Sequence, residues 1–584
     1  MNFTPPTPPS SAASRFAARF AALPSPLLFA LFFAAVALSH LTLLHLPYFW
    51  DEAGYYIPAA LDFYHYSALI PQFSNAHPPL PNVVLGTLWH ITGYHVLTTR
   101  LTVCAFAAGA LLAVFRLTQR LLGPAAAIAT TFLTAVYPIW FAQSTLAHAD
   151  IFAAAFTLAA FALYLPSLNL SSRPQPALAA AQNLSSRPQP ALAAAQNLSS
   201  RPQRSAVERP LYLSFARCAA IAALFSLAAI SKETAIIEPA ILAAIHLTLL
   251  FVHRRDAALR SLHKTWLATL SIPLLPLLAW YAYHHHKAGS VFGNRTYLRY
   301  NATANFNAAH IVTSFYYRGI HLFWQRNIWL PILLALACLL LPKRTLTPDP
   351  QPLTPVFRTI ALLLLGNWLV FSVLGGALLT RYLLPMYPLI LFVCVAIWCG
   401  RTRYWPWLAA LTAAAFVSAI WLNPPTSFAP EDNLTYRDMI VVHQEAAAYI
   451  DRHYPDAQVL TAWPASSELF VVDLGYVSQT IKVTPLENFT AAEINKAAQE
   501  PGKFDTALIF TTHYTSPALQ RYLLKHPNTK RGREFAQDRD LTPQEVAAIL
   551  HGTVIVEYER NGETAAVLRF SRSYEARNIP PLTR

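Results

Sequence analysis

Charged residues are scarce in this chain. Only 12% of its 584 residues are Asp, Glu, Lys or Arg, which is about half the fraction in a typical soluble domain. The hydrophobic residues, 55% of the total, come in blocks that are long enough to cross a bilayer. This composition excludes an ordinary soluble protein and predicts a polytopic α-helical membrane protein.

Cysteine is also scarce, and its distribution excludes two common kinds of site. The five cysteines lie inside apolar blocks, without the spacing of a disulfide framework or a zinc site, and we expect them to be packing residues: Cys104, Cys218, Cys338, Cys394 and Cys399. The charged C-terminal part contains no GxGxxG motif, P-loop or catalytic-triad spacing. The net charge of +14 comes largely from basic turns between apolar blocks, so it predicts membrane orientation and no nucleic-acid partner.

Eleven membrane spans are predicted with a window of about twenty residues. They centre on residues 25–45, 100–118, 124–142, 150–166, 211–230, 234–253, 265–283, 326–342, 357–377, 382–399 and 404–422. Basic residues gather in alternate turns, which we place in the cytoplasm together with the N-terminus. The protein is then integral to the plasma (inner) membrane, and the residues after 424 lie on its external, periplasmic side.

Composition divides the chain further. Residues 1–22 are predicted to be a disordered cytoplasmic tail, and residues 23–423 the membrane domain. This domain includes an external loop, 47–99, and a cytoplasmic low-complexity loop, 167–210, which carries a direct repeat. Residues 424–584 are predicted to form a soluble α/β domain, with helices at 436–454, 493–499 and 543–550 and strands at 458–461, 470–472, 506–510 and 553–556.

The strongest candidate site begins with Asp51 and Glu52, directly after the first span. A carboxylate that faces lipid costs roughly 2.5–3.5 kcal/mol on insertion scales, so an acidic pair at this position indicates function. No Lys or Arg occurs between Pro47 and Thr99 to neutralise it. Residues 51–66 are predicted to form a helix on the membrane surface that also carries Tyr55. The structural alternative is that the two carboxylates only cap this helix.

Further polar residues are predicted on the same side of the membrane. Each has a structural alternative, such as a helix cap, an ion pair or a snorkelling side chain. Together, two cations and several carboxylates outline a site for an anionic, phosphate-bearing substrate. If the site takes a divalent metal, Glu52 and His77 are the candidate ligands, and no other cofactor is predicted. The remaining candidates are His148, Asp150, Lys232, Glu233, Arg381 and Tyr382.

The combination of motifs resembles a known family over about residues 20–425. The motifs are the acidic pair, the turn His77-Pro78-Pro79-Leu80, Asp150 at the head of a later span, and a segment that begins Arg381-Tyr382-Leu383-Leu384-Pro385. They resemble the GT-C glycosyltransferases, in the branch of the protein O-mannosyltransferases and lipid A aminoarabinose transferases. The chain lacks the large inserted lumenal domain of the eukaryotic mannosyltransferases.

The resemblance implies a transferase that takes a sugar from a polyprenyl-phosphate donor on the outer face of the membrane. It implies that Asp51 is the catalytic acid of the first external loop and Asp150 the second acidic position. The requirements of the transfer reaction agree with these residues. One carboxylate is needed to accept the proton of an acceptor hydroxyl, and cations are needed to hold the leaving phosphate. The acceptor is a lipid, a glycan or a protein, and membrane lipids are the other partners.

Two other classes of function remain open at this stage. A transporter or flippase for a lipid-linked or anionic glycan would place its charges near the middle of the membrane and often shows internal repeats. A non-catalytic membrane anchor would leave the acidic loop without a role. The charges predicted here cluster at one membrane edge instead, which favours the transferase.

Overall fold

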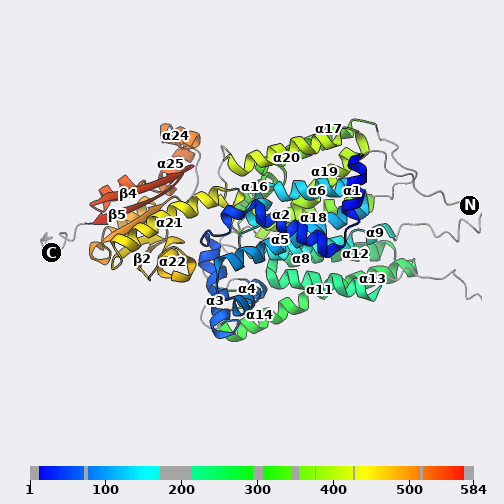
Figure 1. Ribbon diagram of the computed structural model, residues 1–584, viewed down its shortest axis with the longest axis horizontal. Helices are drawn as coiled ribbons and strands as arrows, with labels where there is room; N and C mark the ends of the chain where they lie inside the picture. Colours follow the sequence, from blue (N-terminus) through cyan, green and yellow to red (C-terminus); the bar gives the residue numbers. More distant parts are fainter. Residues whose placement is uncertain are drawn as a thin grey trace, which may run out of the picture.

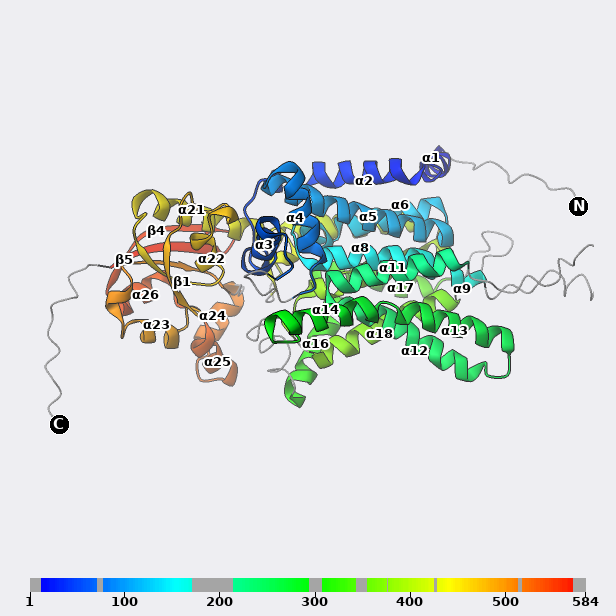
Figure 2. The same ribbon diagram turned by 90° about the horizontal axis from the view of Figure 1, so that it is seen from below.

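The computed structural model describes residues 12–70, 77–170, 214–293, 307–342, 354–374, 376–424, 428–512 and 517–570. It has two parts, a helical bundle and a C-terminal α/β domain (Figures 1 and 2). The predicted repeat loop lies almost entirely outside the described residues. The segment 1–22 was predicted to be disordered, and its residues 1–11 lie outside the described residues; from residue 12 on the prediction is wrong, because α1 (Ala12–Ala21) forms and Phe20 packs edge-on against Phe115 with ring centroids 5.7 Å apart.

The bundle is built from apolar helices joined by short connections. Its longer helices are α2 (Ser25–Ser39), α5 (Val96–Leu122), α6 (Pro124–Val136), α8 (Ala149–Tyr164), α11 (Phe215–Ser231), α12 (Ile237–Val252), α13 (Ala257–Ser271), α14 (Leu274–Ala288), α16 (Ala308–Phe323), α17 (Trp329–Leu339), α18 (Thr354–Leu374), α19 (Met386–Arg401) and α20 (Trp405–Trp421). The shorter helices are α7 (Pro138–Gln143), α9 (Ser167–Leu170) and the 3₁₀ turns 41–43, 233–236, 325–327 and 380–383.

The helices are those of an integral membrane protein, but the count of eleven spans is not confirmed. Among the described residues, four helices are long and apolar enough to cross a membrane, and two pairs bent by 108° and 90° raise the number to six. Five shorter apolar helices coincide with other predicted spans: α6, α8, α11, α19 and α20. Proline explains one difference in length between a predicted span and the observed helices. Pro138 divides the predicted span 124–142 into α6 and α7.

α8 is the central helix of the bundle. It is rich in alanine, and most of its side chains are buried. Small side chains let neighbouring helices approach closely, which is how membrane helices associate in the absence of a hydrophobic driving force. α5 and α11 pack along α8, and α6, α19 and α20 lie beyond α5 (Figures 1 and 2). The close packing fixes the start of α8, and with it Asp150.

The external loop forms a compact layer at one end of the bundle. A π-helical turn (Glu52–Tyr56) runs into α3 (Ile57–Tyr66), and α4 (Leu80–Thr92) folds back against α3. Both helices lie between the bundle and the C-terminal domain (Figures 1 and 2). The predicted helix over 51–66 therefore forms, and its residues Tyr56, Ile57 and Ala60 are buried.

The C-terminal domain is a five-stranded sheet with helices on both faces. The strands β1 (Gln458–Ala462), β2 (Lys482–Leu486), β3 (Thr506–Phe510), β4 (Gly552–Arg560) and β5 (Glu563–Phe570) lie in the order β2-β1-β3-β5-β4. β1 pairs in parallel with β2 and β3, whereas β5 pairs antiparallel with β3 and β4. α21 (Thr435–His453) covers one face, and α23 (Ala491–Ala497) and α26 (Pro543–Ile549) cover the other (Figure 2).

Most of the helices and strands predicted for this domain are present in the structure, and one predicted strand is wrong. The predicted strand at 470–472 is instead the end of α22 (Ala465–Phe470) and a 3₁₀ turn, Val472–Leu474. The run Ala-Ser-Ser-Glu-Leu favours a helix, and Glu468 accepts a 2.7 Å hydrogen bond from His443 of α21. The sequence prediction omitted β2, β5, α24 (Pro517–Lys525) and α25 (Lys530–Asp538).

The C-terminal domain rests directly on the external loop. The Tyr476 hydroxyl donates a 3.0 Å hydrogen bond to the Tyr48 carbonyl, and the Trp463 ring lies 5.0 Å from the Trp50 ring. A side chain on Gly54 would meet Trp463 at 2.5 Å, so only glycine allows this approach. The domain therefore fixes the backbone on both sides of Asp51.

The membrane orientation can be tested with reporter fusions. α1 and the α12–α13 turn lie at the end of the bundle opposite the C-terminal domain (Figure 2). We predict that fusions after Gln203 and after Arg437 report opposite sides of the membrane, with Gln203 in the cytoplasm, because the basic turns should stay there. Equal reporter activity at the two positions would contradict the eleven-span topology.

Candidate functional site

Arg381 is the centre of a charged cluster at the end of the bundle that the C-terminal domain covers. It lies in the 3₁₀ turn Thr380–Leu383, and its side chain is buried. Its guanidinium forms ion pairs with Asp51 and Glu431 and lies 3.3 Å from Asp150. Three carboxylates from distant parts of the sequence therefore meet on one arginine, whose planar fork can pair with several anions at once.

Lys232 is the second cation of the cluster. It follows the last residue of α11, and its Nζ donates a 2.5 Å hydrogen bond to Asp150 Oδ1. The same ammonium lies 4.0 Å from the centre of the Tyr382 ring, at cation–π distance. Arg318 also lies over the Tyr382 ring, at 5.4 Å, and donates to the backbone carbonyls of Leu379 and Ala377. The Tyr382 ring thus lies at cation–π distance from both Lys232 and Arg318.

Asp51 is the carboxylate of the cluster that solvent reaches most easily. Its side chain is 19% exposed, compared with 2% for Asp150 and 5% for Glu431. Asp150 is held between Lys232 and Arg381, whereas Asp51 forms an ion pair with Arg381 at the open side of the cluster. An incoming molecule can therefore meet Asp51 with the least rearrangement.

Glu431 is the member of the cluster that sequence reasoning missed. It lies in the 3₁₀ turn Pro430–Asp432, between the bundle and α21. Burial raises the pKa of the Glu431 carboxyl to about 7, although the Arg381 guanidinium lowers it. The neighbouring Asp432 accepts hydrogen bonds from Thr380 and from Gln325, which anchors this turn to the bundle. The link to the C-terminal domain therefore completes the site.

Glu52 points away from this cluster into a separate buried pair. Its Oε1 lies 2.5 Å from Arg100 Nη1, and its oxygens also accept from the backbone N–H groups of Ala147 and Phe49. Arg100 in turn donates to the carbonyls of Pro47 and Thr145. These contacts tie the external loop to α5 and to the segment before α8, so the geometry indicates a structural role for Glu52.

The predicted histidines lie beside the cluster around an aromatic ring. His77 Nδ1 lies 3.0 Å from Glu233, and its ring stacks on Tyr56 with centroids 5.4 Å apart. Tyr56 is fully buried and also contacts the ring of His148, whose Nδ1 lies 3.3 Å from Arg381. Tyr56 was missed by sequence reasoning, although helical spacing from Glu52 could have suggested it.

The candidate metal ligands do not share a site. Glu52 pairs with Arg100 and His77 pairs with Glu233. No group of three or more His, Cys, Asp or Glu side chains in the described ranges has a geometry that would hold a metal ion. The carboxylates that do converge surround a guanidinium, so this donor set does not fit a metal.

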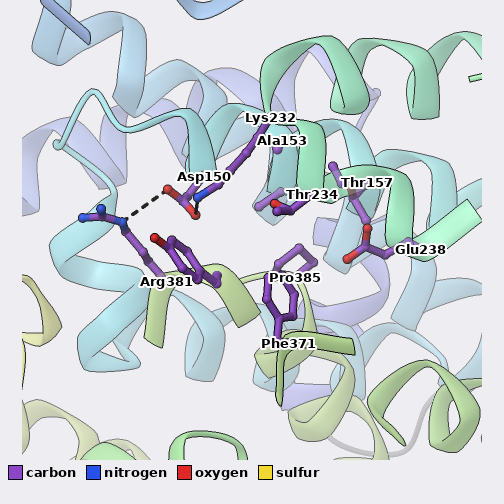
Figure 3. A pocket seen from close by; sticks show the side chains of 12 residues that line it. Asp150, Ala153, Thr157, Lys232, Thr234, Glu238, Phe371, Arg381 and Pro385 are labelled. Atoms are coloured by element: carbon purple, nitrogen blue, oxygen red, sulfur yellow. Dashed lines mark hydrogen bonds and ion pairs between the residues drawn. The ribbon is translucent and has the colours of Figure 1, made fainter. Parts of the chain in front are cut away.

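Tyr55 lies at the rim of the site. Its ring is 5.7 Å from Trp463 of the C-terminal domain, on the same π-helical turn that follows Asp51. Asp150, Lys232, Arg381 and Tyr382 line a pocket that runs into the bundle (Figure 3). The predicted candidates therefore fall into three groups: the Arg381 cluster and its pocket, the His77–Glu233 pair, and the Glu52–Arg100 pair.

The structural role of Glu52 gives a testable prediction. Breaking a buried ion pair by removing one partner typically costs about 3–5 kcal/mol. We therefore predict that Glu52→Leu and Arg100→Met each lower the thermal unfolding midpoint strongly, and that the double variant recovers part of the loss. Unfolding in detergent followed by tryptophan fluorescence measures this. A Glu52→Gln variant with unchanged stability and abolished activity would instead make Glu52 a catalytic residue.

No family model matches the chain, and no curated protein matches its sequence. Solved structures do match. ArnT from Cupriavidus metallidurans bound to undecaprenyl phosphate aligns over 93% of this chain and 98% of its own, with 13% identity and a TM-score of 0.46. The apo state of the same enzyme gives 12% identity and a TM-score of 0.47.

A second neighbour is the oligosaccharyltransferase AglB from Archaeoglobus fulgidus, in complex with an inhibitory peptide and a dolichol-phosphate. It aligns over 89% of this chain and 70% of its own, with 12% identity and a TM-score of 0.39. Both neighbours are members of the GT-C superfamily, the family that the sequence motifs of this chain resemble.

Proposed function

We propose that this protein is a membrane glycosyltransferase that moves a sugar from a polyprenyl-phosphate donor to a lipid, glycan or protein acceptor. The reaction takes place at the end of the bundle covered by the C-terminal domain, which we assign to the outer face of the membrane. The observation that carries the proposal is the arrangement around Arg381: two buried cations beside one accessible carboxylate, Asp51.

The cations suit a donor phosphate. Arg381 presents several N–H donors in a planar fork, and Lys232 adds a compact positive charge on the other side of Asp150. Both are already paired with carboxylates, so an incoming phosphate competes with these for the same donors. Asp51 is the most accessible of the three and is the one we expect the phosphate to displace from Arg381.

Once the donor phosphate has displaced it from Arg381, the Asp51 carboxylate can act as the general base that the transfer reaction needs. The acceptor oxygen attacks the anomeric carbon of the sugar, and the bond between that carbon and the phosphate oxygen breaks. The electron pair stays on the polyprenyl phosphate, whose charge Arg381 and Lys232 stabilise. The proton of the acceptor hydroxyl passes to Asp51. A single displacement of this kind inverts the anomeric centre.

Asp150 then acts as a positioning residue. It bridges Lys232 and Arg381, and it is almost completely buried, so it has little access to an acceptor. The cluster holds three carboxylates against two cations, so a phosphate binds more easily if one carboxylate is neutral. Glu431, whose pKa burial raises to about 7, is the group able to take that proton.

The roles of Asp51 and Arg381 are separable. Asp51→Asn removes the base and should lower turnover by about 10²–10⁴-fold, while donor affinity should rise, because a neutral amide competes less with the phosphate for Arg381. Arg381→Ala removes a phosphate contact and should weaken donor binding. Turnover and donor affinity of each variant in nanodiscs measure the difference, with Asp62→Asn on the same loop and the exposed Arg403→Ala as matched controls.

Two outcomes would count against these assignments. Near-normal turnover in Asp51→Asn, with a complete loss in Asp150→Asn, would move the base to Asp150. If no carboxylate variant affected transfer of any sugar, but the protein moved a lipid-linked glycan across vesicles, the transporter would replace the transferase.

The Glu431 carboxyl predicts a pH dependence of donor binding. Below pH 7 it is mostly neutral and leaves Arg381 with two anionic partners, whereas above pH 7 it ionises and competes with the donor. A sugar phosphodiester does not titrate here, so donor affinity should fall by up to about tenfold as pH rises from about 6 to about 8. Glu431→Gln should flatten the profile at the high-affinity level.

The matched control for this titration is Glu563→Gln. Burial also raises the pKa of Glu563, to about 8, but this carboxyl lies on β5 of the C-terminal domain. The control should keep the normal profile. A profile that is unchanged in Glu431→Gln would assign the titration to another group.

A further inference from the structure

Three aromatic rings lie beside Asp51 on the open side of the charged cluster. Trp50 directly precedes Asp51, and Tyr55 follows it by four residues, close to one helical turn further on. Trp463 comes from the C-terminal domain, and its ring centroid lies 5.0 Å from that of Trp50 and 5.7 Å from that of Tyr55. We call the rings of Trp50, Tyr55 and Trp463 the aromatic platform.

The phenol of Tyr55 feels the charge of the Asp51 carboxylate. Burial raises the pKa of Tyr55, and the negative charge of Asp51 raises it further. An effect of this kind falls off with distance, so the two side chains are neighbours at the rim of the site. The aromatic platform therefore begins at the carboxylate that we propose as the base.

The rings of the aromatic platform keep part of their surface uncovered. Trp50, Tyr55 and Trp463 are each half-buried. Phe49 and Tyr436 form another aromatic contact between the external loop and the C-terminal domain, with ring centroids 5.8 Å apart, and both are almost completely buried. Packing between the two parts of the molecule accounts for that second contact. It does not account for three rings that remain partly open beside the proposed base.

Trp50 has an unfavourable backbone conformation. Its φ is 41°, in the left-handed region, where a residue with a large side chain is an outlier. Such conformations cost free energy and gather at functional sites, where the surrounding structure enforces them. Here the neighbours on both sides are fixed, because Phe49 is buried and Asp51 pairs with Arg381. The conformation keeps the indole of Trp50 in contact with Trp463 at the mouth of the site.

A sugar ring is complementary to this surface. The C–H groups of a sugar form apolar faces that pack against the π face of an aromatic ring, which carries the negative part of its quadrupole. The hydroxyl groups at the edge of a sugar can pair with indole N–H groups and with a phenol. Aromatic rings are also common where a protein meets the membrane surface, but those rings face lipid. Trp463 instead faces the external loop, where it lies against Gly54.

The proposed reaction puts the donor sugar on this side of the cluster. The sugar is bonded directly to the phosphate, which Arg381 and Lys232 hold in the proposed function. The acceptor oxygen attacks the anomeric carbon from the side opposite the phosphate, and Asp51 takes its proton. Because Asp51 lies at the open side of the cluster, the sugar must lie there too, next to the aromatic platform.

We propose that the aromatic platform binds the sugar ring of the donor by stacking. This inference rests on the proposed function, in which Arg381 and Lys232 hold the phosphate. It makes Trp50, Tyr55 and Trp463 the residues that distinguish a sugar-bearing donor from the bare polyprenyl phosphate. It also gives the C-terminal domain a direct contact with the substrate, through Trp463.

The test compares the affinity of the full-length protein in nanodiscs for two kinds of lipid. One is undecaprenyl phosphate, and the other is undecaprenyl phosphate linked to mannose, glucose or galactose. The wild type should bind at least one sugar-linked lipid more tightly than the bare phosphate. Trp50→Leu, Tyr55→Leu and Trp463→Leu should each weaken binding of that lipid by about threefold to tenfold, because each removes a stacking surface. Binding of undecaprenyl phosphate should stay unchanged.

Controls separate stacking from packing. Trp50→Phe and Tyr55→Phe keep an aromatic ring and should retain most of the affinity for the sugar-linked lipid. Trp407→Leu removes an exposed ring near the start of α20, at the end of that helix away from the C-terminal domain, and should change neither affinity. Normal binding of undecaprenyl phosphate by a Leu variant shows that its charged cluster is intact.

The outcomes separate this inference from the proposed function. If the wild type binds neither kind of lipid, the proposed function fails and this inference fails with it. If the wild type binds undecaprenyl phosphate but no sugar-linked lipid more tightly, the phosphate site stands and the aromatic platform does not bind the donor sugar. The same conclusion follows if the Leu variants weaken both kinds of lipid equally, or if they bind every sugar-linked lipid as the wild type does.

Discussion

The buried positive charge of Arg381 is the constraint on which the site depends. A guanidinium cannot lose its proton in a protein, so it must be matched by anions wherever water is excluded. Asp51, Asp150 and Glu431 supply these anions from the external loop, α8 and the link to the C-terminal domain. Each of these segments is therefore held in place by the need to neutralise one charge.

The same requirement explains why the two parts of the molecule are packed so closely. Glu431 reaches Arg381 only if the chain after α20 turns back over the bundle, and Asp432 fixes that turn through Thr380 and Gln325. Trp463 and Tyr476 then hold the backbone around Asp51. The C-terminal domain is thus part of the structure that positions the catalytic loop, and the Glu52–Arg100 pair holds that loop from the membrane side.

The sequence predicted much of this arrangement, because apolar blocks and an acidic pair at a membrane edge have few physical explanations. Asp51, Asp150, Lys232 and Arg381 do converge. Glu431 could not be identified as a site residue from its position in the sequence, because a polar segment after the last span is typical of the start of any soluble domain. Arg100 had a usable signal, since a cation at the start of an apolar helix needs an anion, but its partner Glu52 lies 48 residues earlier in the sequence.

Other differences between the sequence predictions and the structure come from contacts between residues that lie far apart in the sequence. The pairing of Glu52 with Arg100, and of His77 with Glu233, depends on how the external loop folds over α5 and α12, and no local pattern specifies that. The lengths of the shorter apolar helices depend on where proline and the turns end them, so the number of spans was less predictable than their order.

The central claim is that a donor phosphate replaces a carboxylate on Arg381. A cryo-electron microscopy structure of the protein in nanodiscs with undecaprenyl phosphate tests it most directly. We predict that the phosphate oxygens lie within about 3 Å of Arg381 and Lys232, and that the Asp51 carboxylate has moved off the guanidinium. A phosphate bound elsewhere, with Asp51, Asp150 and Glu431 all still on Arg381, would contradict the account.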